Sequence, residues 1–196
     1  MKILFHGLAL CLSLALCACG SSQKSTNDLG EEMSDSKAHN AWRIDPSSRS
    51  IGNGQHFREQ AAINIAELQA RAALARKLST AIKYTAREEF GGDQKFVGNN
   101  EVGKSVSEHS EGNVDRVEAI SREIVKDASI IEISRFKQKD NQYNAYVCVG
   151  YIGGKKEMAE KAYQALEQLI PDGEKQKIRD DRDKIIKNIQ ASFDKK

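Results

Sequence analysis

The spacing of apolar residues divides much of the chain into two kinds of segment, one with helical spacing and one with the alternation typical of strands. From about Phe57 to Arg87 the apolar residues recur at helical spacing, which predicts a long amphipathic helix. The main stripe is Ala61, Ile65, Leu68, Ala72, Ala75, Leu78 and Ile82, and it is widened by Ala62, Ala66, Ala70 and Ala73. Because small side chains let a helix lie close to its neighbour, we expect it to cover a sheet. The charged positions Arg58, Glu59, Arg71, Arg76, Lys77 and Lys83 are expected to face solvent.

From Ser129 onward the apolar residues alternate with polar ones, which predicts strands. One strand is expected over 129–136 and a second over 143–151, joined by a polar turn at 137–142. This pattern predicts an antiparallel β-hairpin. A further short strand is expected at 48–51, closed by the turn Gly52-Asn53-Gly54.

Two more helices are expected on either side of the hairpin. Ser105 and Glu108 have capping-box spacing, which predicts the start of a second helix, with Gly112 as a candidate break. Another helix is expected over 156–169, before Pro171.

The last predicted helix, from about Gly173 to Phe193, is highly charged and has only a narrow apolar seam. The seam consists of Ile178, Ile185, Ile186, Ile189 and Phe193. Such a seam either packs on its own domain or pairs two subunits. Together these elements predict an α+β fold, with helices packed on a small antiparallel sheet.

The N-terminus looks like a bacterial lipoprotein signal. Lys2 precedes an uncharged apolar run from Ile3 to Leu16, which has the length of a signal peptide and is too short to span a bilayer. The run ends in Leu16-Cys17-Ala18-Cys19, with the small Ala18 directly before Cys19. We therefore expect cleavage before Cys19 and lipidation of that residue. The alternative is an ordinary secretory signal cut near Ala18, which would leave Cys19 as a free thiol.

The stretch from Gly20 to about Asn40 is polar, and it lacks the apolar surface needed to offset the entropy of ordering. It is expected to be a flexible tether. We divide the chain into a signal peptide (1–18), a tether (19–41), an α+β domain (42–171) and a charged C-terminal helix (172–196). Trp42 is expected to pack where the ordered chain begins, or alternatively to anchor a partner or a membrane interface.

Composition limits the classes of partner. The 196 residues include 30 Lys plus Arg and 28 Asp plus Glu, giving a formal net charge of +2. This balance argues against a domain that binds nucleic acid. Of the 4 cysteines, Cys11 and Cys17 would leave with the signal and Cys19 would carry lipid. Only Cys148 would then remain as a thiol, so no intramolecular disulfide is expected.

Several of these features together resemble the LPP-twenty lipoprotein family. They are the lipid-anchored N-terminus, a glycine-containing turn, the helix with Ala62-Ala66-Ala70 and then Ala72-Ala73-Leu74-Ala75, and a hairpin ending in Tyr146-Val147-Cys148-Val149. The resemblance covers about 51–152. It implies a fold similar to the N-terminal domain of a flagellar assembly protein, and it implies no catalytic residues. The charged last helix extends beyond the family's usual length.

The candidates for chemistry are few. Gly150-Tyr151-Ile152-Gly153-Gly154-Lys155-Lys156 approaches a phosphate-binding loop, but its spacing is one residue short and Lys156 stands where Ser or Thr is needed. His39, His56 and His109 have no metal-binding spacing, and Cys148 has no second thiolate nearby in sequence, so no metal site is expected. Cys148 is expected to be a core thiol, with a nucleophile paired to His56 or His109 as the alternative. The acidic pairs Glu31-Glu32, Glu88-Glu89 and Asp180-Asp181 are expected to be solvated.

Two functions remain open. The favoured one is a non-catalytic envelope lipoprotein without a cofactor, held by lipid at the outer membrane with its domain in the periplasm or on the cell surface. Its domain is expected to bind a protein partner or itself. The expected surfaces are the charged last helix and an exposed edge of the sheet. Gly20 favours the outer membrane because it is not the aspartate that retains many lipoproteins at the inner membrane. The alternative is a ligand-binding or hydrolytic lipoprotein whose site is formed by the 91–103 loop.

Overall fold

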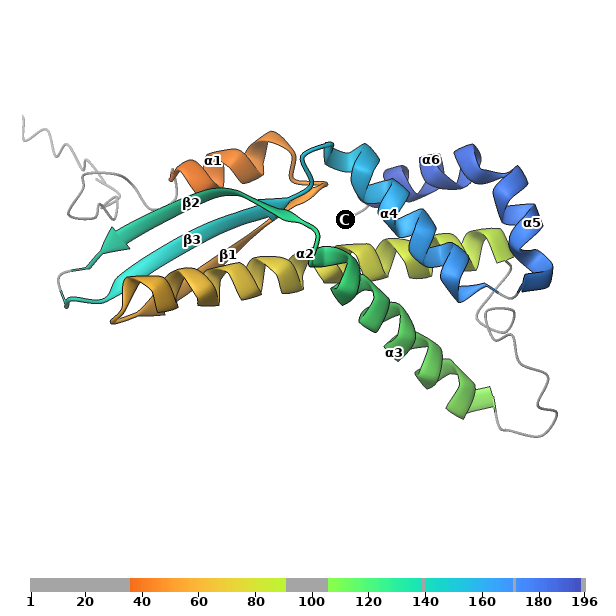
Figure 1. Cartoon of the computed structure of the whole chain (residues 1–196), viewed down its shortest axis with the longest axis horizontal. Helices are drawn as coiled ribbons and strands as arrows, with labels where there is room; N and C mark the ends of the chain where they lie inside the picture. The colour runs from red at the N-terminus through yellow and green to blue at the C-terminus, as the bar shows by residue number, and fades with distance from the viewer. Residues whose placement is uncertain (1–35, 91–105, 139, 171, 195–196) are drawn as a thin grey trace, which may run out of the picture.

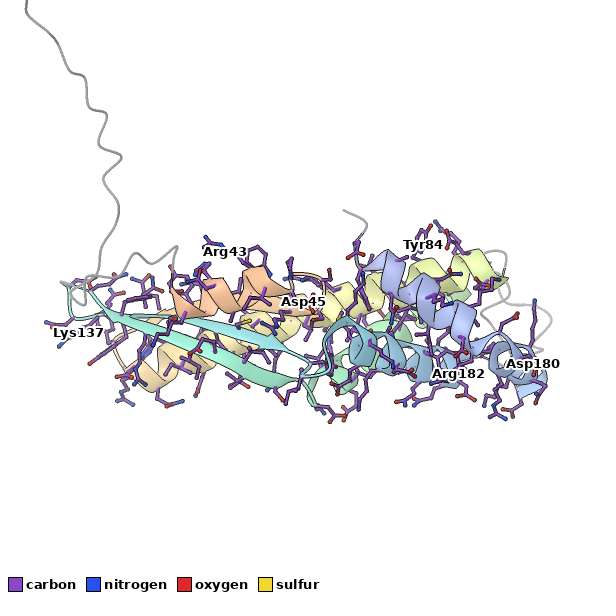
Figure 2. The ribbon with its side chains drawn as sticks, turned by 90° about the horizontal axis from the view of Figure 1, so that it is seen from above. Arg43, Asp45, Tyr84, Lys137, Asp180 and Arg182 are labelled. Carbon is purple, nitrogen blue, oxygen red and sulfur yellow. The ribbon has the colours of Figure 1, made fainter. Side chains whose placement is uncertain are left out.

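The computed structural model describes residues 36–90, 106–138, 140–170 and 172–194. Its elements in chain order are α1 (Lys37–Ile44), β1 (Arg49–His56), α2 (Glu59–Phe90), α3 (Val106–Val125), β2 (Ser129–Lys137), β3 (Tyr143–Gly150), α4 (Gly154–Leu169), α5 (Asp172–Asp180) and α6 (Arg182–Ser192). The fold is α+β, as predicted from the sequence. Figure 1 shows a long molecule in which α2 runs beneath the sheet at one end and beside α4, α5 and α6 at the other. Seen from above in Figure 2, charged side chains such as Arg43 and Asp180 point outward.

The three strands form one antiparallel sheet in the order β1-β3-β2. The predicted hairpin of β2 and β3 is confirmed, and a bulge interrupts its register between Ile130 and Glu132. Strand β1 pairs with the other edge of β3, so that Gly52 faces Val147 and Gly54 faces Ala145. The central strand is therefore the most buried of the three.

The predicted turn Gly52-Asn53-Gly54 is instead the middle of strand β1. Both glycines lie directly against α2. A Cβ atom added to Gly52 would lie 2.0 Å from the Ala66 carbonyl oxygen, and one added to Gly54 would lie 2.0 Å from the Ala62 carbonyl oxygen. Glycine inside a strand often marks such a close backbone approach. The glycines thus permit contact between strand and helix where a turn was expected.

Helix α2 spans the predicted segment, but its buried face differs from the predicted stripe. Ala62, Ala66 and Ala70 are fully buried against the glycines of β1. Leu68, placed in the centre of the predicted stripe, is instead 68% exposed, and Ala72 is exposed as well. The sequence pattern correctly predicted a helix packed on a sheet. It did not correctly predict which side of the helix faces the sheet.

Two cations of α2 that were expected to face solvent instead hold neighbouring segments. The Lys77 ammonium donates to the carbonyls of Pro46 and Arg49, at 2.6 Å each. Burial lowers the pKa of Lys77, and the charge of Asp45 partly opposes that shift. The Arg71 guanidinium reaches the segment between α3 and β2 and is described with the site below.

The last residues assigned to the tether belong to helix α1, which corrects the boundary at residue 41. The Ser36 hydroxyl accepts from the His39 amide and caps the helix. The Ala38 amide donates to the Ser134 hydroxyl of β2 at 2.9 Å, and the His39 ring lies 4.6 Å from the Tyr146 ring. Helix α1 therefore covers the face of the sheet opposite α2. Trp42, the last aromatic residue before Pro46, is half-buried.

The predicted C-terminal helix is two helices, α5 and α6, which meet at Asp181. Its seam residues Ile178, Ile185, Ile186 and Ile189 are all buried in the main core, and Phe193 packs against it. The seam therefore packs on its own domain and offers no surface for pairing two subunits. Helix α3 also differs from the prediction, because it continues through Gly112 without a break.

Candidate functional site

Cys19, the predicted lipidation site, lies outside the described residues, as do Glu31, Glu32 and the 91–103 loop. The structure therefore describes the domain and not the predicted lipidation site. Over the described ranges, no helix is both long and apolar enough to cross a membrane.

Cys148 is a free thiol fully buried in β3, as expected for a core cysteine. Burial raises the pKa of Cys148 to about 11, although the nearby charges of Arg49 and Lys77 act in the opposite direction. The thiol stays protonated at neutral pH, whereas a nucleophilic cysteine needs its thiolate. This environment disfavours the alternative of a catalytic cysteine.

The glycine-rich junction at 150–156 is occupied by the protein's own groups. The Gly153 amide donates to the Glu157 carboxylate at 2.8 Å, and the Lys155 ammonium pairs with Asp194. A phosphate loop needs free amides and a lysine directed at the same anion. Here one amide and one lysine are already bound to carboxylates that would repel a phosphate.

The remaining histidines and acids are dispersed. The His56 ring accepts from the Arg58 amide at 2.9 Å, and the side chain of His109 lies outside the described part. Glu89 is 13% exposed and binds Lys184 and Asn188, so it fastens α2 to α6. Within the described ranges, no group of three or more His, Cys, Asp or Glu side chains could hold a metal ion.

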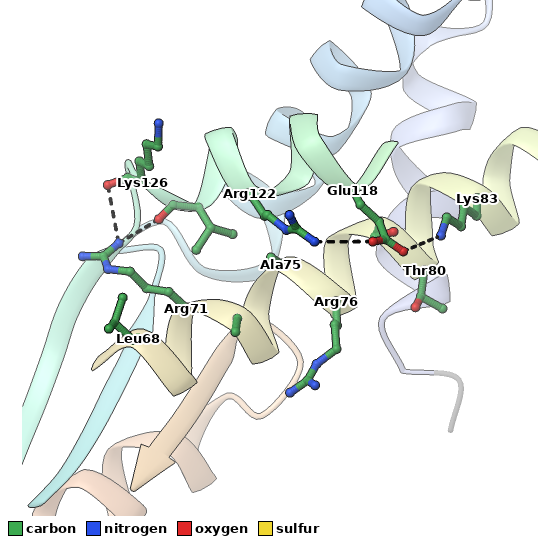
Figure 3. A pocket seen from close by; sticks show the side chains of 12 residues that line it. Leu68, Arg71, Ala75, Arg76, Thr80, Lys83, Glu118, Arg122 and Lys126 are labelled. Carbon is green, nitrogen blue, oxygen red and sulfur yellow. Dashed lines mark hydrogen bonds and ion pairs between the residues drawn. The ribbon is translucent and has the colours of Figure 1, made fainter. Parts of the chain in front are cut away.

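A groove of about 600 Å³ lies between α2 and α3. Its floor is apolar and consists of Leu68, Ala72 and Ala75 from α2 with Val125 from α3. Ser79 and Thr80 continue the groove along α2. Figure 3 shows the two helices side by side, with charged side chains on both rims.

Arg71 links α2 to the C-terminal end of α3 beside this groove. Its guanidinium donates to the carbonyls of Val125 and Ala128, at 2.7 and 2.9 Å, and makes a longer contact of 3.4 Å with the Lys126 carbonyl. The Glu67 carboxylate accepts from the same guanidinium at 2.8 Å. The C-terminal carbonyls of a helix have no partners within the helix, and a cation there also interacts favourably with the helix dipole. Arg71 thus fixes one end of α3 on α2 (Figure 3).

Cations predominate around the groove. Arg71, Arg76, Lys83, Arg122 and Lys126 line it, and Glu118 is the single carboxylate among the described lining residues. Glu118 lies between Lys83, at 3.2 Å, and Arg122, at 3.6 Å. Two acids lie just outside the lining, Glu67 beside Arg71 and Glu123 beside Lys126. Five cations against three carboxylates leave the surface around an apolar floor positive.

The sequence pattern included the residues that line the groove, but it did not predict that they form a groove. Leu68, Ala72 and Ala75 were predicted to be part of a buried stripe, which is the usual position of apolar residues on an amphipathic helix. One signal could have distinguished these groove residues from the buried face of α2. It is the run Ala62, Ala66, Ala70, whose small side chains pack against the glycines of β1. Once those alanines occupy the sheet, Leu68 and Ala72 must lie on another side of α2.

No protein-family model matches the chain, and no curated protein matches it. The resemblance to the LPP-twenty family therefore stays a prediction from the residues quoted above.

Proposed function

We propose that the protein is a lipid-anchored lipoprotein of the outer membrane, whose domain binds another protein and carries out no catalysis. The observation that carries this proposal is the sequence Leu16-Cys17-Ala18-Cys19 directly behind an uncharged apolar run. It combines a signal of the right length with a small residue before the cysteine to be lipidated.

The chemistry of the domain supports a binding role. The buried Cys148 thiol is protonated, the Gly153 amide is occupied, and Glu89 is engaged with α6. By contrast, the groove between α2 and α3 is open, apolar at its floor and charged at its rims. Burying an exposed leucine is a favourable contribution to association, and polar rims are typical of protein interfaces.

Counting thiols tests the lipid anchor. The chain has 4 cysteines, and a chain cut before Cys19 and lipidated there retains Cys148 as its single free thiol. The denatured protein purified from membranes should therefore react with one equivalent of a thiol reagent. Two equivalents would indicate an ordinary signal cut near Ala18, and four would indicate no processing.

Metabolic labelling with palmitate gives the matched genetic test. Cys19→Ser should abolish labelling and leave the chain unprocessed or soluble, whereas Cys17→Ser should label as strongly as the parent. If Cys19→Ser retained the label, the anchor proposal would be wrong. Fractionation of the two membranes tests the destination, where we expect the parent in the outer membrane and Gly20→Asp in the inner membrane.

A further inference from the structure

We propose that the groove between α2 and α3 binds an amphipathic helix of a partner protein, with an apolar stripe flanked by aspartates and glutamates. This inference deepens the proposed function and rests on it for the presence of a protein partner at the membrane. The shape, the floor and the charge of the groove all favour this one kind of occupant.

The shape of the groove favours a helix. Its walls are two helices, which Arg71 joins at the C-terminal end of α3 and the Lys83–Glu118 ion pair joins farther along, and in Figure 1 α3 leads away from α2 beyond Arg71. An amphipathic helix placed along such a groove makes contact with both walls, a recurring mode of peptide recognition.

The floor favours an apolar stripe with helical spacing. Leu68, Ala72 and Ala75 are separated by four and three residues, so they lie along one side of α2. Leu68 is 68% exposed, and the small Ala72 beside it leaves room for a side chain of the partner. The occupant therefore needs its own apolar residues at spacings of three and four.

The rims favour carboxylates on both sides of that stripe. Arg76 lies on the α2 rim and has no hydrogen-bond or ion-pair partner among the described residues. Arg122 lies on the α3 rim with its side chain 74% exposed, and its contact with Glu118 is 3.6 Å long. Lys126, 69% exposed, extends the positive charge along the same wall. A helix with basic flanks would meet these cations unfavourably, so the charge discriminates between classes of partner.

A peptide-binding assay on the full chain purified in detergent tests the proposal. Two fluorescent peptides of one helical design are compared, with leucines at spacings of three and four and with either glutamates or lysines on both flanks. We expect the glutamate peptide to bind at least ~10-fold more tightly than the lysine peptide, measured by fluorescence anisotropy. Equal binding of the two peptides, or no binding of either, overturns the proposal.

Substitutions locate the binding. Leu68→Glu should weaken binding of the glutamate peptide ~10-fold or more, because it places a carboxylate on the floor. Its matched control is Ile152→Glu, at another exposed apolar residue, 83% exposed, and the control should bind like the parent. On the rim, Arg76→Glu should weaken binding ~3-fold and the exposed Lys156→Glu should not. Circular dichroism checks that each variant is folded, and equal losses in Leu68→Glu and Ile152→Glu contradict the proposal.

One further arm separates a protein partner from an anionic membrane. Thr80→Cys, at another exposed position of the groove lining, is labelled with a dye that senses polarity, so that Leu68 stays available to the peptide. The labelled chain is placed in nanodiscs of phosphatidylcholine with or without phosphatidylglycerol. We expect the dye to respond to the glutamate peptide and not to phosphatidylglycerol. The reverse result would assign this face to the membrane and overturn the proposal. The peptide-binding assays do not need the lipid on Cys19, so their failure is distinct from failure of palmitate labelling.

Discussion

The two flanks of helix α2 use similar residues for opposite purposes. On one flank Ala62, Ala66 and Ala70 lie so close to β1 that no side chain fits at Gly52 or Gly54. On the other flank Leu68 and Ala72 remain exposed at the floor of a groove. Apolar residues at helical spacing therefore do not by themselves indicate a core. Their role depends on whether the neighbouring element approaches to backbone contact or is held away.

The difference has an energetic consequence. Side chains on the sheet flank are part of a close-packed interior, where added volume forces the backbone to move. Side chains on the groove flank have space around them, so they can change with little effect on stability. A domain with this division can vary the residues of the groove flank while keeping its fold.

The largest expected effect follows from adding a side chain at Gly52. Gly52→Val would bring a Cβ atom to 2.0 Å from the Ala66 carbonyl oxygen and 2.5 Å from the Ala70 amide nitrogen, so α2 must separate from β1. We expect a loss of ~4 kcal/mol or more in the free energy of unfolding, measured with a chemical denaturant.

The control for this substitution is Gly173→Ala, where an added Cβ meets nothing within 4 Å. Its free energy of unfolding should stay within ~1 kcal/mol of the parent. If Gly52→Val were as stable as Gly173→Ala, the close approach of strand and helix would be wrong.

A smaller effect is expected where α3 is attached to the groove flank. Arg71→Met keeps the apolar part of the side chain and removes the donor to the carbonyls of Val125 and Ala128. We expect a loss of ~2 kcal/mol, because buried carbonyls lose a charged donor. Hydrogen exchange should increase in α3 near Val125 more than in β1. An unchanged exchange rate in α3 would show that Arg71 does not hold this helix.

Thiol chemistry compares the closed and open sides without changing the fold. Cys148, buried in the sheet, should react with a thiol reagent at neutral pH only when the domain opens. A thiol introduced by Ala72→Cys should react at the rate of an exposed cysteine. Comparable rates at the two positions would contradict the difference between the flanks.

The same thiol gives a pH dependence of stability. Burial raises the pKa of Cys148 to about 11 from an ordinary value of 9.0, so the folded state keeps a proton that the unfolded state loses first. The contribution of Cys148 is therefore fully present below about pH 9 and is lost as the pH rises toward about 11. Cys148→Ala should show a shallower decrease of stability over this interval than the parent, in denaturant unfolding at a series of pH values.

Much of the fold followed from periodicity in the sequence. The alternation in β2 and β3 and the helical spacing in α2 and α4 are strong local signals, and the structure confirms these elements. Strand β1 was cut short because Gly52 and Gly54 were interpreted as a turn. The reason for those glycines lies in the alanines of α2, which are adjacent only after folding.

Other differences also depend on contacts distant in sequence. Helix α1 has only eight residues, and its Ala38 is positioned by a hydrogen bond to Ser134. The groove could not be predicted because Arg71, expected in solvent, instead fixes the end of α3. Whether a charged side chain faces solvent or holds another segment depends on the carbonyls near it. For Arg71 these carbonyls belong to a segment that is distant in sequence.

One pair of variants tests the division of α2 most directly, because it places the same substitution on both flanks of one helix. Ala66→Leu adds volume between α2 and β1, whereas Ala72→Leu adds it to the open groove. Denaturant unfolding should give a loss of ~3 kcal/mol for Ala66→Leu and a change within ~0.5 kcal/mol for Ala72→Leu. Equal losses for the two variants would mean that both flanks are closed or both are open. That result would contradict the difference between the two flanks of α2.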